Sequence, residues 1–196
     1  MAIDPQALAF LDARRSVPAK QLDAPAPDHA TLVRMLQSAV RVPDHGKRVP
    51  FRFLRIAGDA RDALGRIVAA RGSQRDPQAG PAAAEKDLHR FSHAPLVLVV
   101  VAVLDPADTA IPPQERLLTA GCCCFALLQA AQALGYGASW LTGWPAYDPE
   151  VLRVLGLGAD ERVAEFIHIG HPRREAPELE RPDAAALLGD WQPPPG

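Results

Sequence analysis

The side chains best suited to ligand chemistry in this 196-residue chain lie in four short segments, the first of which is Arg14, Arg15 and Ser16. Two guanidinium groups and a hydroxyl suit a phosphate, because planar N–H forks match its oxygens and the positive charge persists at any pH. Two arginines at the end of a helix can equally serve to complement the helix dipole. The triplet therefore indicates an anion site only in combination with other signals.

A second segment combines three basic side chains, His45, Lys47 and Arg48, between Pro43 and Pro50. Prolines restrict the backbone, and a loop held in one conformation can present hydrogen-bond donors to a ligand. The alternative is a solvated basic loop without a ligand. The position of the segment, between a predicted helix and a predicted strand, is compatible with both interpretations.

The third and fourth segments follow predicted elements nearer the end of the chain. The third begins at a Gly-rich turn and contains Trp140, Leu141 and Thr142. Small residues beside a strand permit a flat ligand to approach the backbone closely. The fourth places Arg173 and Arg174 directly after the last predicted strand. It adds a second arginine pair at the edge of a sheet.

Several well-known catalytic motifs are absent from the sequence: the Gly-x-Gly-x-x-Gly fingerprint, the phosphate-binding P-loop and the Gly-x-Ser-x-Gly elbow. Glu85, His89 and His93 are spaced four residues apart, so a helix would place them on one face that could hold a metal ion. An exposed helix surface is the preferred interpretation, because no further ligand lies nearby in the sequence. No metal site is predicted.

Hydrophobic periodicity and turn residues predict an α+β chain. Helices are predicted at residues 5–15, 60–71, 82–91, 112–134 and 149–155, and strands at residues 51–57, 95–104, 137–141 and 163–170. A further helix begins after Asp28 and ends before Pro43, with one apolar face made of Leu32, Val33, Leu36, Ala39 and Val40. Residues 16–27 are predicted to be an irregular loop, and residues 72–81 a mobile one.

The longest predicted helix, residues 112–134, opens with two prolines and ends at Gly135. Its middle consists almost entirely of small or apolar residues, so it must be covered on several sides. A domain of this size has few fully internal helices, and we therefore expect this helix near a homodimer interface. The Pro-rich tail, about residues 171–196, carries Leu179, Leu187, Leu188 and Trp191 and is expected to wrap around the partner subunit.

The composition excludes several classes of protein. A net charge of −2 provides no basic surface for nucleic acid and no polybasic patch for a membrane. The three cysteines, Cys122, Cys123 and Cys124, are adjacent and cannot form a disulfide framework, so we expect buried, reduced thiols in a cytoplasmic protein. A redox role would require an exposed thiolate. The first residues lack the basic and apolar regions of a secretion signal.

Taken together, the four segments resemble the nitroreductase family, specifically its compact bacterial members. Family members share an N-terminal helix ending in Arg-Arg-Ser and a Pro-Asp-His loop that leads through Pro and an aromatic residue into the first strand. They also share a long small-residue helix ending in a Gly-rich turn with Trp, and a Gly-x-Pro after the last strand. The match covers nearly the whole chain. It implies one nitroreductase-like domain over residues 1–196, with a mostly antiparallel central sheet flanked by helices.

The resemblance also implies one FMN per subunit, bound at the dimer interface by residues from both chains. By carry-over, the phosphate and ribityl end would be held by Arg14, Arg15 and Ser16. One side of the flavin would meet His45 and the stretch Lys47, Arg48 and Val49, and the other side would be lined by Trp140, Leu141 and Thr142. Additional charge near the phosphate would come from Arg173 or Arg174. Two positions depart from the family pattern. Val49 replaces a frequent polar amide, and Leu141 replaces an arginine of related compact members.

The activity implied is that of an FMN-dependent NAD(P)H oxidoreductase acting on nitroaromatic or quinone-like small molecules. NADH or NADPH would deliver a hydride and leave before the acceptor binds at the same site, which is a ping-pong scheme. Because the flavin carries the chemistry, no catalytic protein nucleophile is expected. Lys47, Arg48 or His45 would stabilise negative charge on the reduced flavin. The alternatives are a flavin carrier or non-catalytic ligand-binding protein, and a different flavin reaction.

Overall fold

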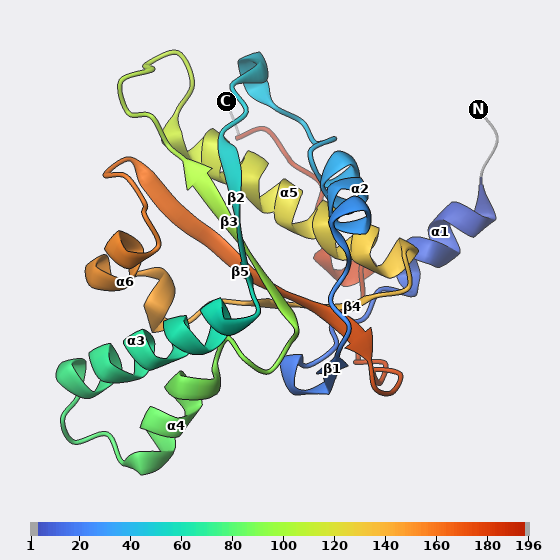
Figure 1. Cartoon of the computed structure of the whole chain (residues 1–196). Coiled ribbons are helices and arrows are strands. Elements are labelled where there is room, and N and C mark those ends of the chain that lie inside the picture. Colours follow the sequence, from blue (N-terminus) through green and yellow to red (C-terminus); the bar gives the residue numbers. More distant parts are fainter. Residues whose placement is uncertain (1–3, 195–196) are drawn as a thin grey trace.

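The computed structural model describes residues 4–194 and has one antiparallel β-sheet with helices on both faces (Figure 1). The central strand is β5 (Glu161–Pro172), which pairs with β1 (Leu22–Asp23), β3 (Leu96–Val103) and β4 (Gly137–Leu141). Strand β2 (Phe51–Ala57) pairs with the other edge of β3. All these pairings are antiparallel, which confirms the predicted α+β class.

Strand β3 shows why the sheet is buried on both faces. Seven of its eight residues are buried, and the β-branched residues of this strand suit a pleated surface that is covered on both sides. Leu98 and Val100 face one hydrophobic cluster, whereas Val97 and Val99 face another. The alternation follows from the two-residue period of a strand. The near-continuous apolar pattern therefore predicted this strand correctly.

Two groups of helices cover these two faces (Figure 1). On one face, α2 (His29–Ala39) packs against α5 (Pro113–Ala133), and α5 packs on β3, β4 and β5. On the other face lie α3 (Asp59–Arg75), α4 (Pro81–His89) and α6 (Pro149–Val154). Helix α1 (Pro5–Asp12) extends beyond the sheet near the C-terminal end of α5. Short 3₁₀ turns lie at Ala19–Gln21, His45–Lys47, Trp144–Ala146 and Ala185–Leu187.

Helix α5 has the caps that the sequence predicted. Pro112 is its N-cap residue and Gly135, with φ of 79°, follows its C-terminus. Its length and composition would permit a membrane span, yet half of its most apolar window is buried inside the fold. The side turned away from the sheet carries an exposed apolar stripe, formed by Leu118, Cys122 and Phe125. This spacing of four and three residues places the three side chains on one face.

Some element boundaries differ from the prediction. Helix α1 ends at Asp12 rather than Arg15, because the chain must become extended for the Val17 N–H to donate to the Ala138 carbonyl at 3.0 Å. Helix α3 continues to Arg75, so the predicted mobile loop was wrong at its beginning. The guanidinium of Arg75 lies 4.4 Å from the centre of the Trp144 ring, a tertiary contact without a local sequence signal.

The predicted irregular loop over residues 16–27 contains a short 3₁₀ helix and β1. Strand β5 covers residues 161–172 instead of 163–170, because its end pairs with β1, where Leu22 faces Pro172, and its beginning pairs with β3. The tail consequently begins later than predicted. A two-residue strand makes no periodic pattern, so its partner decides its conformation.

Two residues predicted to be buried are exposed. Val40 follows the end of α2 and is 43% exposed, whereas Met35 occupies the core position on that helix. Cys122 is exposed, although Cys123 and Cys124 are buried as predicted. Burial, and to a smaller extent the nearby Cys122, raises the pKa of the Cys123 thiol to about 12. Cys123 therefore stays a thiol at neutral pH.

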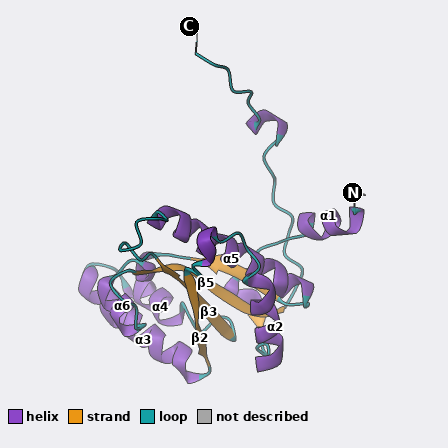
Figure 2. Cartoon of the chain, turned by 90° about the horizontal axis from the view of Figure 1, so that it is seen from above, coloured by secondary structure: helices purple, strands orange, loops and turns teal. Residues whose placement is uncertain are grey.

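The tail beyond β5 leaves the body of the molecule on the side of α1 (Figure 2). Leu179, Leu187, Leu188 and Trp191 are between 62% and 81% exposed. Apolar side chains of this size are rarely so exposed together unless a partner covers them. In the described chain, Glu178 and Arg181 of the tail contact Arg15 and Arg14 near α1. The wrapping of a partner subunit by the tail stays a prediction.

Candidate functional site

The Arg14–Arg15–Ser16 triplet follows α1, whose first turn is capped by the Asp4 carboxylate. Arg14 Nη1 donates to Ser16 Oγ at 3.4 Å, and Arg15 Nη1 donates to the Asp12 carbonyl at 2.8 Å. Arg15 also forms an ion pair with Glu178 of the tail. Because the next residue, Val17, is hydrogen-bonded to β4, the triplet is fixed beside the edge of the sheet.

A third arginine, which the sequence analysis missed, joins this triplet from the tail. Arg181 Nε donates to Glu178 Oε1 at 3.0 Å, and its Nη2 donates to the Arg14 carbonyl at 3.5 Å. A cavity of about 530 Å³ is lined by Arg14, Arg15 and Arg181 together with Asp12 and Glu178. Three guanidinium groups against two carboxylates leave a positive excess, and this donor set fits a phosphate group.

Arg173 and Arg174 have different contacts from those expected by carry-over. Arg173 donates two hydrogen bonds to the Asp23 carboxylate, at 2.7 and 3.0 Å, which lower the pKa of Asp23. Arg174 Nε donates to Gln21 Oε1 at 3.2 Å. Both arginines therefore fasten the end of β5 to the β1 segment. In the described chain, neither lines the cavity of the three arginines.

Trp140 and Leu141 lie at the end of β4 and point to opposite faces of the sheet. Trp140 shares the α5 face with Ala138, whereas Leu141 points toward α4, where it lines a cavity. They are 37% and 39% exposed, so both are available to a ligand. Glu165 is a neighbour of Trp140 on the α5 face. Burial raises the pKa of Glu165, and a hydrogen bond with the Trp140 side chain offsets part of this increase.

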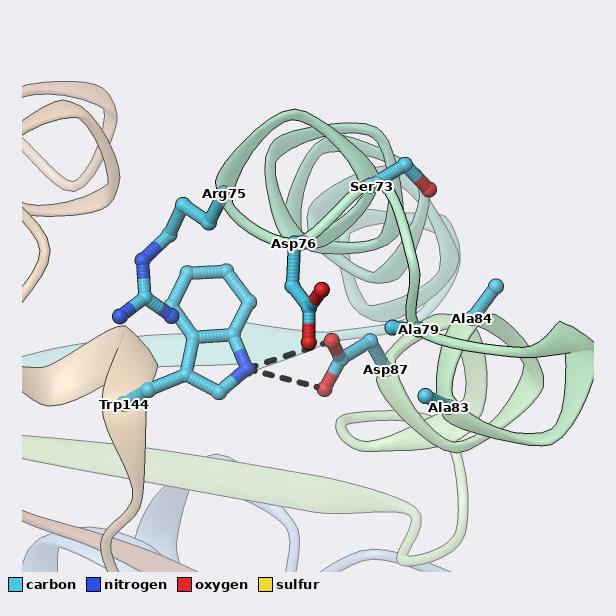
Figure 3. Close-up of a pocket in the computed structure, with 9 residues that line it drawn as sticks. Ser73, Arg75, Asp76, Ala79, Ala83, Ala84, Asp87 and Trp144 are labelled. Carbon is cyan, nitrogen blue, oxygen red and sulfur yellow. Dashed lines mark hydrogen bonds between the residues drawn. The ribbon is translucent and has the colours of Figure 1, made fainter.

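Thr142 lies in the loop after β4, and Trp144 fastens this loop to the rest of the fold. The Trp144 ring lines a cavity of about 310 Å³ between α3 and α4 (Figure 3). Trp144 Nε1 donates to both carboxylate oxygens of Asp87 at 3.2 Å, and Asp87 also accepts a bond from Arg90 at 2.9 Å. A Cβ at Gly143, where φ is 131°, would lie 2.9 Å from Arg90 Nη1. Only glycine fits this position without displacing the arginine.

The His45 segment lies at the N-terminal end of α5. His45 Nδ1 is 2.7 Å from Glu115 Oε2 in the first turn of that helix. The Asp44 carboxylate accepts the backbone N–H groups of Arg48 and Val49 at 3.1 and 2.8 Å. These bonds hold the loop in an uncommon conformation.

Two non-glycine residues of this loop adopt left-handed backbone angles, Lys47 with φ of 53° and Val49 with φ of 49°. For a β-branched residue this conformation is an outlier, and such residues concentrate at functional sites. Val49 is also 60% exposed, so its side chain is available to a partner or ligand.

The arginine triplet and the His45 segment lie at opposite ends of α5 (Figure 1). His45 contacts Glu115, whereas Gln132 donates to the Phe10 carbonyl at 3.1 Å and lines a cavity with Arg15. A helix rises about 1.5 Å per residue, so the two contacts lie about 25 Å apart along the axis. One chain therefore does not bring its two predicted half-sites together.

His89 and His93 have ring centres 6.2 Å apart and line one cavity with Glu85. Among residues 4–194, no group of three His, Cys, Asp or Glu side chains is placed to hold a metal ion.

Comparison with known proteins gives matches over most of the chain. The model of the Nitroreductase family matches residues 11–171. A protein of Haemophilus influenzae, provisionally named an NAD(P)H nitroreductase, is 34% identical over 165 residues, which cover 84% of this chain and 87% of that protein.

Two solved structures have the same fold. A nitroreductase-like protein of Bacillus cereus has a TM-score of 0.78 at 21% identity, covering 96% of this chain and 97% of that one. A Bacteroides fragilis nitroreductase solved with bound FMN has a TM-score of 0.73 at 18% identity, covering 96% of this chain and all of that one. The family match, the fold and the Haemophilus relative agree, and the chain belongs to the nitroreductase family.

Proposed function

We propose that this protein is an FMN-dependent NAD(P)H oxidoreductase of the cytoplasm that reduces nitroaromatic or quinone-like acceptors. The observation that carries the proposal is the cavity of Arg14, Arg15 and Arg181 beside β4, which has the donor set of a phosphate site. The name of the Haemophilus relative and the bound FMN of the Bacteroides structure support the same assignment.

The described residues fit FMN at its phosphate and at its ring. Arg14, Arg15 and Arg181 would hold the phosphate, with Ser16 Oγ as a further hydrogen-bonding group. Trp140 and the loop after it would lie along the ring, since β4 is fixed to the arginine segment through Val17. When bound, FMN supplies the hydride chemistry between NAD(P)H and the acceptor. NAD(P)H and the acceptor would use one site in turn, as in a ping-pong scheme.

The working form is proposed to be a homodimer with flavin sites at the subunit interface. Because the arginine end and the His45 end of α5 are about 25 Å apart, a flavin held by one end meets the other only in a second subunit. A two-fold axis that sets the α5 helices antiparallel would bring unlike ends together at two places. The exposed stripe of Leu118, Cys122 and Phe125 lies at the middle of α5, where such an axis would pass.

His45, Lys47 and Arg48 of the partner subunit would then approach the flavin from the side opposite to Trp140. Their positive charge would stabilise negative charge that develops on the reduced ring. Arg48 already donates to Asp108 at 2.8 Å, so Lys47 is the cation least engaged within its own chain. The left-handed backbone at Lys47 and Val49 fixes the direction in which this loop presents its side chains.

The first test is an absorption spectrum of the purified protein between about 300 and 550 nm, before and after anaerobic NADPH or NADH. The proposal expects flavin bands that bleach with the nucleotide and return with a nitroaromatic or quinone. Flavin bands that no nucleotide bleaches would favour a flavin carrier or another flavin reaction. A protein that stays colourless after incubation with FMN would contradict the proposal and favour a non-catalytic ligand-binding role.

A further inference from the structure

A second basic cavity lies beside the candidate flavin segment, between α4 and the chain that follows the arginine triplet. Its volume is about 450 Å³, enough for an aromatic ring with a substituent. Its apolar lining consists of Ala19 of the first 3₁₀ turn, Ala82 of α4 and Leu141 of β4. Its polar lining comes from Lys20 of the same turn and from side chains of α4 and the turn after it.

The cavity has an excess of positive charge. Lys20, Lys86 and Arg90 line it, against one carboxylate, that of Glu85. Within residues 4–194, neither lysine forms an ion pair, whereas other basic side chains on this face are paired, as Arg90 is with Asp87. This positive charge acts on His93. Burial lowers the pKa of His93, and the charges of Lys20 and His89 lower it further.

Arg90 is only partly satisfied by its own chain. One guanidinium nitrogen, Nη2, donates to Asp87, while Nε is buried and has no partner among the described atoms. The third guanidinium nitrogen, Nη1, forms no hydrogen bond among the described residues and, unlike Nε, is not fully buried. Arg90 therefore has residual capacity to bind an anion.

The cavity shares a wall with the segment proposed to line the flavin. Leu141 contributes its side chain to the cavity, and Arg90 Nη1 would lie 2.9 Å from a Cβ on Gly143, two residues beyond. Lys20, which also lines the cavity, lies four residues after Ser16 of the arginine triplet. A molecule in this cavity would therefore be a direct neighbour of one that occupies the flavin segment.

We propose that this cavity binds the carboxylate of an anionic aromatic acceptor, so that the protein prefers carboxylated nitroaromatics or quinones to neutral ones. The proposal rests on the proposed function. The two lysines and Arg90 hold the carboxylate, and Ala19, Ala82 and Leu141 contact the ring. The presence of apolar and cationic side chains in one cavity matches the two ends of such a molecule.

The experiment compares 4-nitrobenzoate with the neutral 4-nitrobenzamide as acceptors for the flavin-loaded protein. The wild type is expected to show a higher kcat/KM for 4-nitrobenzoate. Lys20→Gln and Lys86→Gln should each lower that value about fivefold, and the double variant about 20-fold, without changing the value for the amide. Arg66→Gln is the control, because it removes an exposed positive charge of α3 outside the cavity.

Calorimetric titration with 4-nitrobenzoate in the absence of NAD(P)H measures the same site without turnover. Binding by the wild type that weakens in the lysine variants supports the anion site, even if neither acceptor is reduced and the proposed function fails. Equal kcat/KM values for the two acceptors, or equal losses for both in the variants, would overturn it. A variant that instead loses flavin, or changes only the KM for NADPH relative to NADH, would assign the lysines to those molecules and also overturn it.

Discussion

At the scale of single residues, Arg14 and Arg181 are expected to control the affinity for FMN. Arg14→Ala and Arg181→Ala each remove a charged donor from the phosphate cavity. A hydrogen bond to a charged group contributes about 1.5–3 kcal/mol, so the Kd for FMN should rise about 10- to 100-fold. Titration of the apoprotein by flavin fluorescence measures this change. Arg66→Ala, on the exposed surface of α3, should leave the Kd unchanged, and unchanged affinity in all three variants would disprove the phosphate site.

His168 gives a prediction about pH. Its ring is 1% exposed and stacks near Phe91, with ring centres 6.4 Å apart. Burial, then His93 and Arg90, lowers the pKa of His168 from 6.5 to about 4. The unfolded state binds a proton more readily, so stability falls as pH drops from about 6.5 toward 4, by about 3 kcal/mol in total.

His168→Gln removes this titration and should flatten that part of the stability curve. The measurement is the free energy of unfolding in urea at several pH values between about 4 and 7. Glutamine changes the packing and can lower stability at every pH, so the slope and not the absolute value is compared. An unchanged slope in the variant would show that other groups control the acid sensitivity.

At the scale of elements, Trp144 connects the loop after β4 to both α3 and α4. Trp144→Phe removes the N–H that donates to Asp87, leaving that buried carboxylate with Arg90 alone. We expect a loss of about 2 kcal/mol in the free energy of unfolding. Tyr147→Phe provides a control, because Tyr147 is an aromatic residue of the same loop region that is 71% exposed. Equal stability of the two variants would mean that Trp144 does not fasten the loop.

The elements with a strong local pattern were predicted well from the sequence. Strands β2 and β4 have the predicted bounds, and the limits of α5 follow its prolines and its terminal glycine. The errors lie where a distant contact decides the conformation. The last turn of α3 is covered by Trp144, and β1 exists because β5 pairs with it.

The residues of the candidate site show the same difference between local patterns, which the sequence reveals, and distant contacts, which it does not. Arg14 and Arg15 were predicted as phosphate-binding residues, because their types and spacing, together with the other three segments, indicate an anion site. Arg181 was missed because it lies in an aperiodic tail, which is brought back to the end of α1 by the Arg15–Glu178 ion pair and by the hydrogen bond from Arg181 to the Arg14 carbonyl. By analogy, Arg173 or Arg174 was predicted to add charge near the phosphate; the contact of Arg173 with Asp23 was not predicted, because Asp23 lies in a strand too short to make a pattern.

At the scale of the whole molecule, the apolar stripe of α5 is expected to form the dimer interface. Phe125 is 46% exposed at the middle of this helix. Phe125→Glu would place a charge in the buried interface and should yield a monomer with reduced flavin content, because burying an unpaired charge is costly. Val154→Glu, on the exposed end of α6, should remain dimeric. Size-exclusion chromatography with light scattering separates these outcomes, and a dimeric Phe125→Glu would place the interface elsewhere.

The placement of the two half-sites at opposite ends of α5 also has a genetic consequence. When FMN is too scarce to load the weakened sites, an Arg14→Ala chain and a chain with His45→Ala and Lys47→Ala would each have little activity alone, yet a mixed dimer of the two would contain one site made of two unaltered halves. Co-expression should therefore restore about a quarter of wild-type activity, since half of the randomly assembled dimers are mixed and each has one good site of two. Two chains damaged in the same half, such as Arg14→Ala with Arg181→Ala, should not rescue each other. In this protein, two defective copies of the gene would be able to sustain one working enzyme.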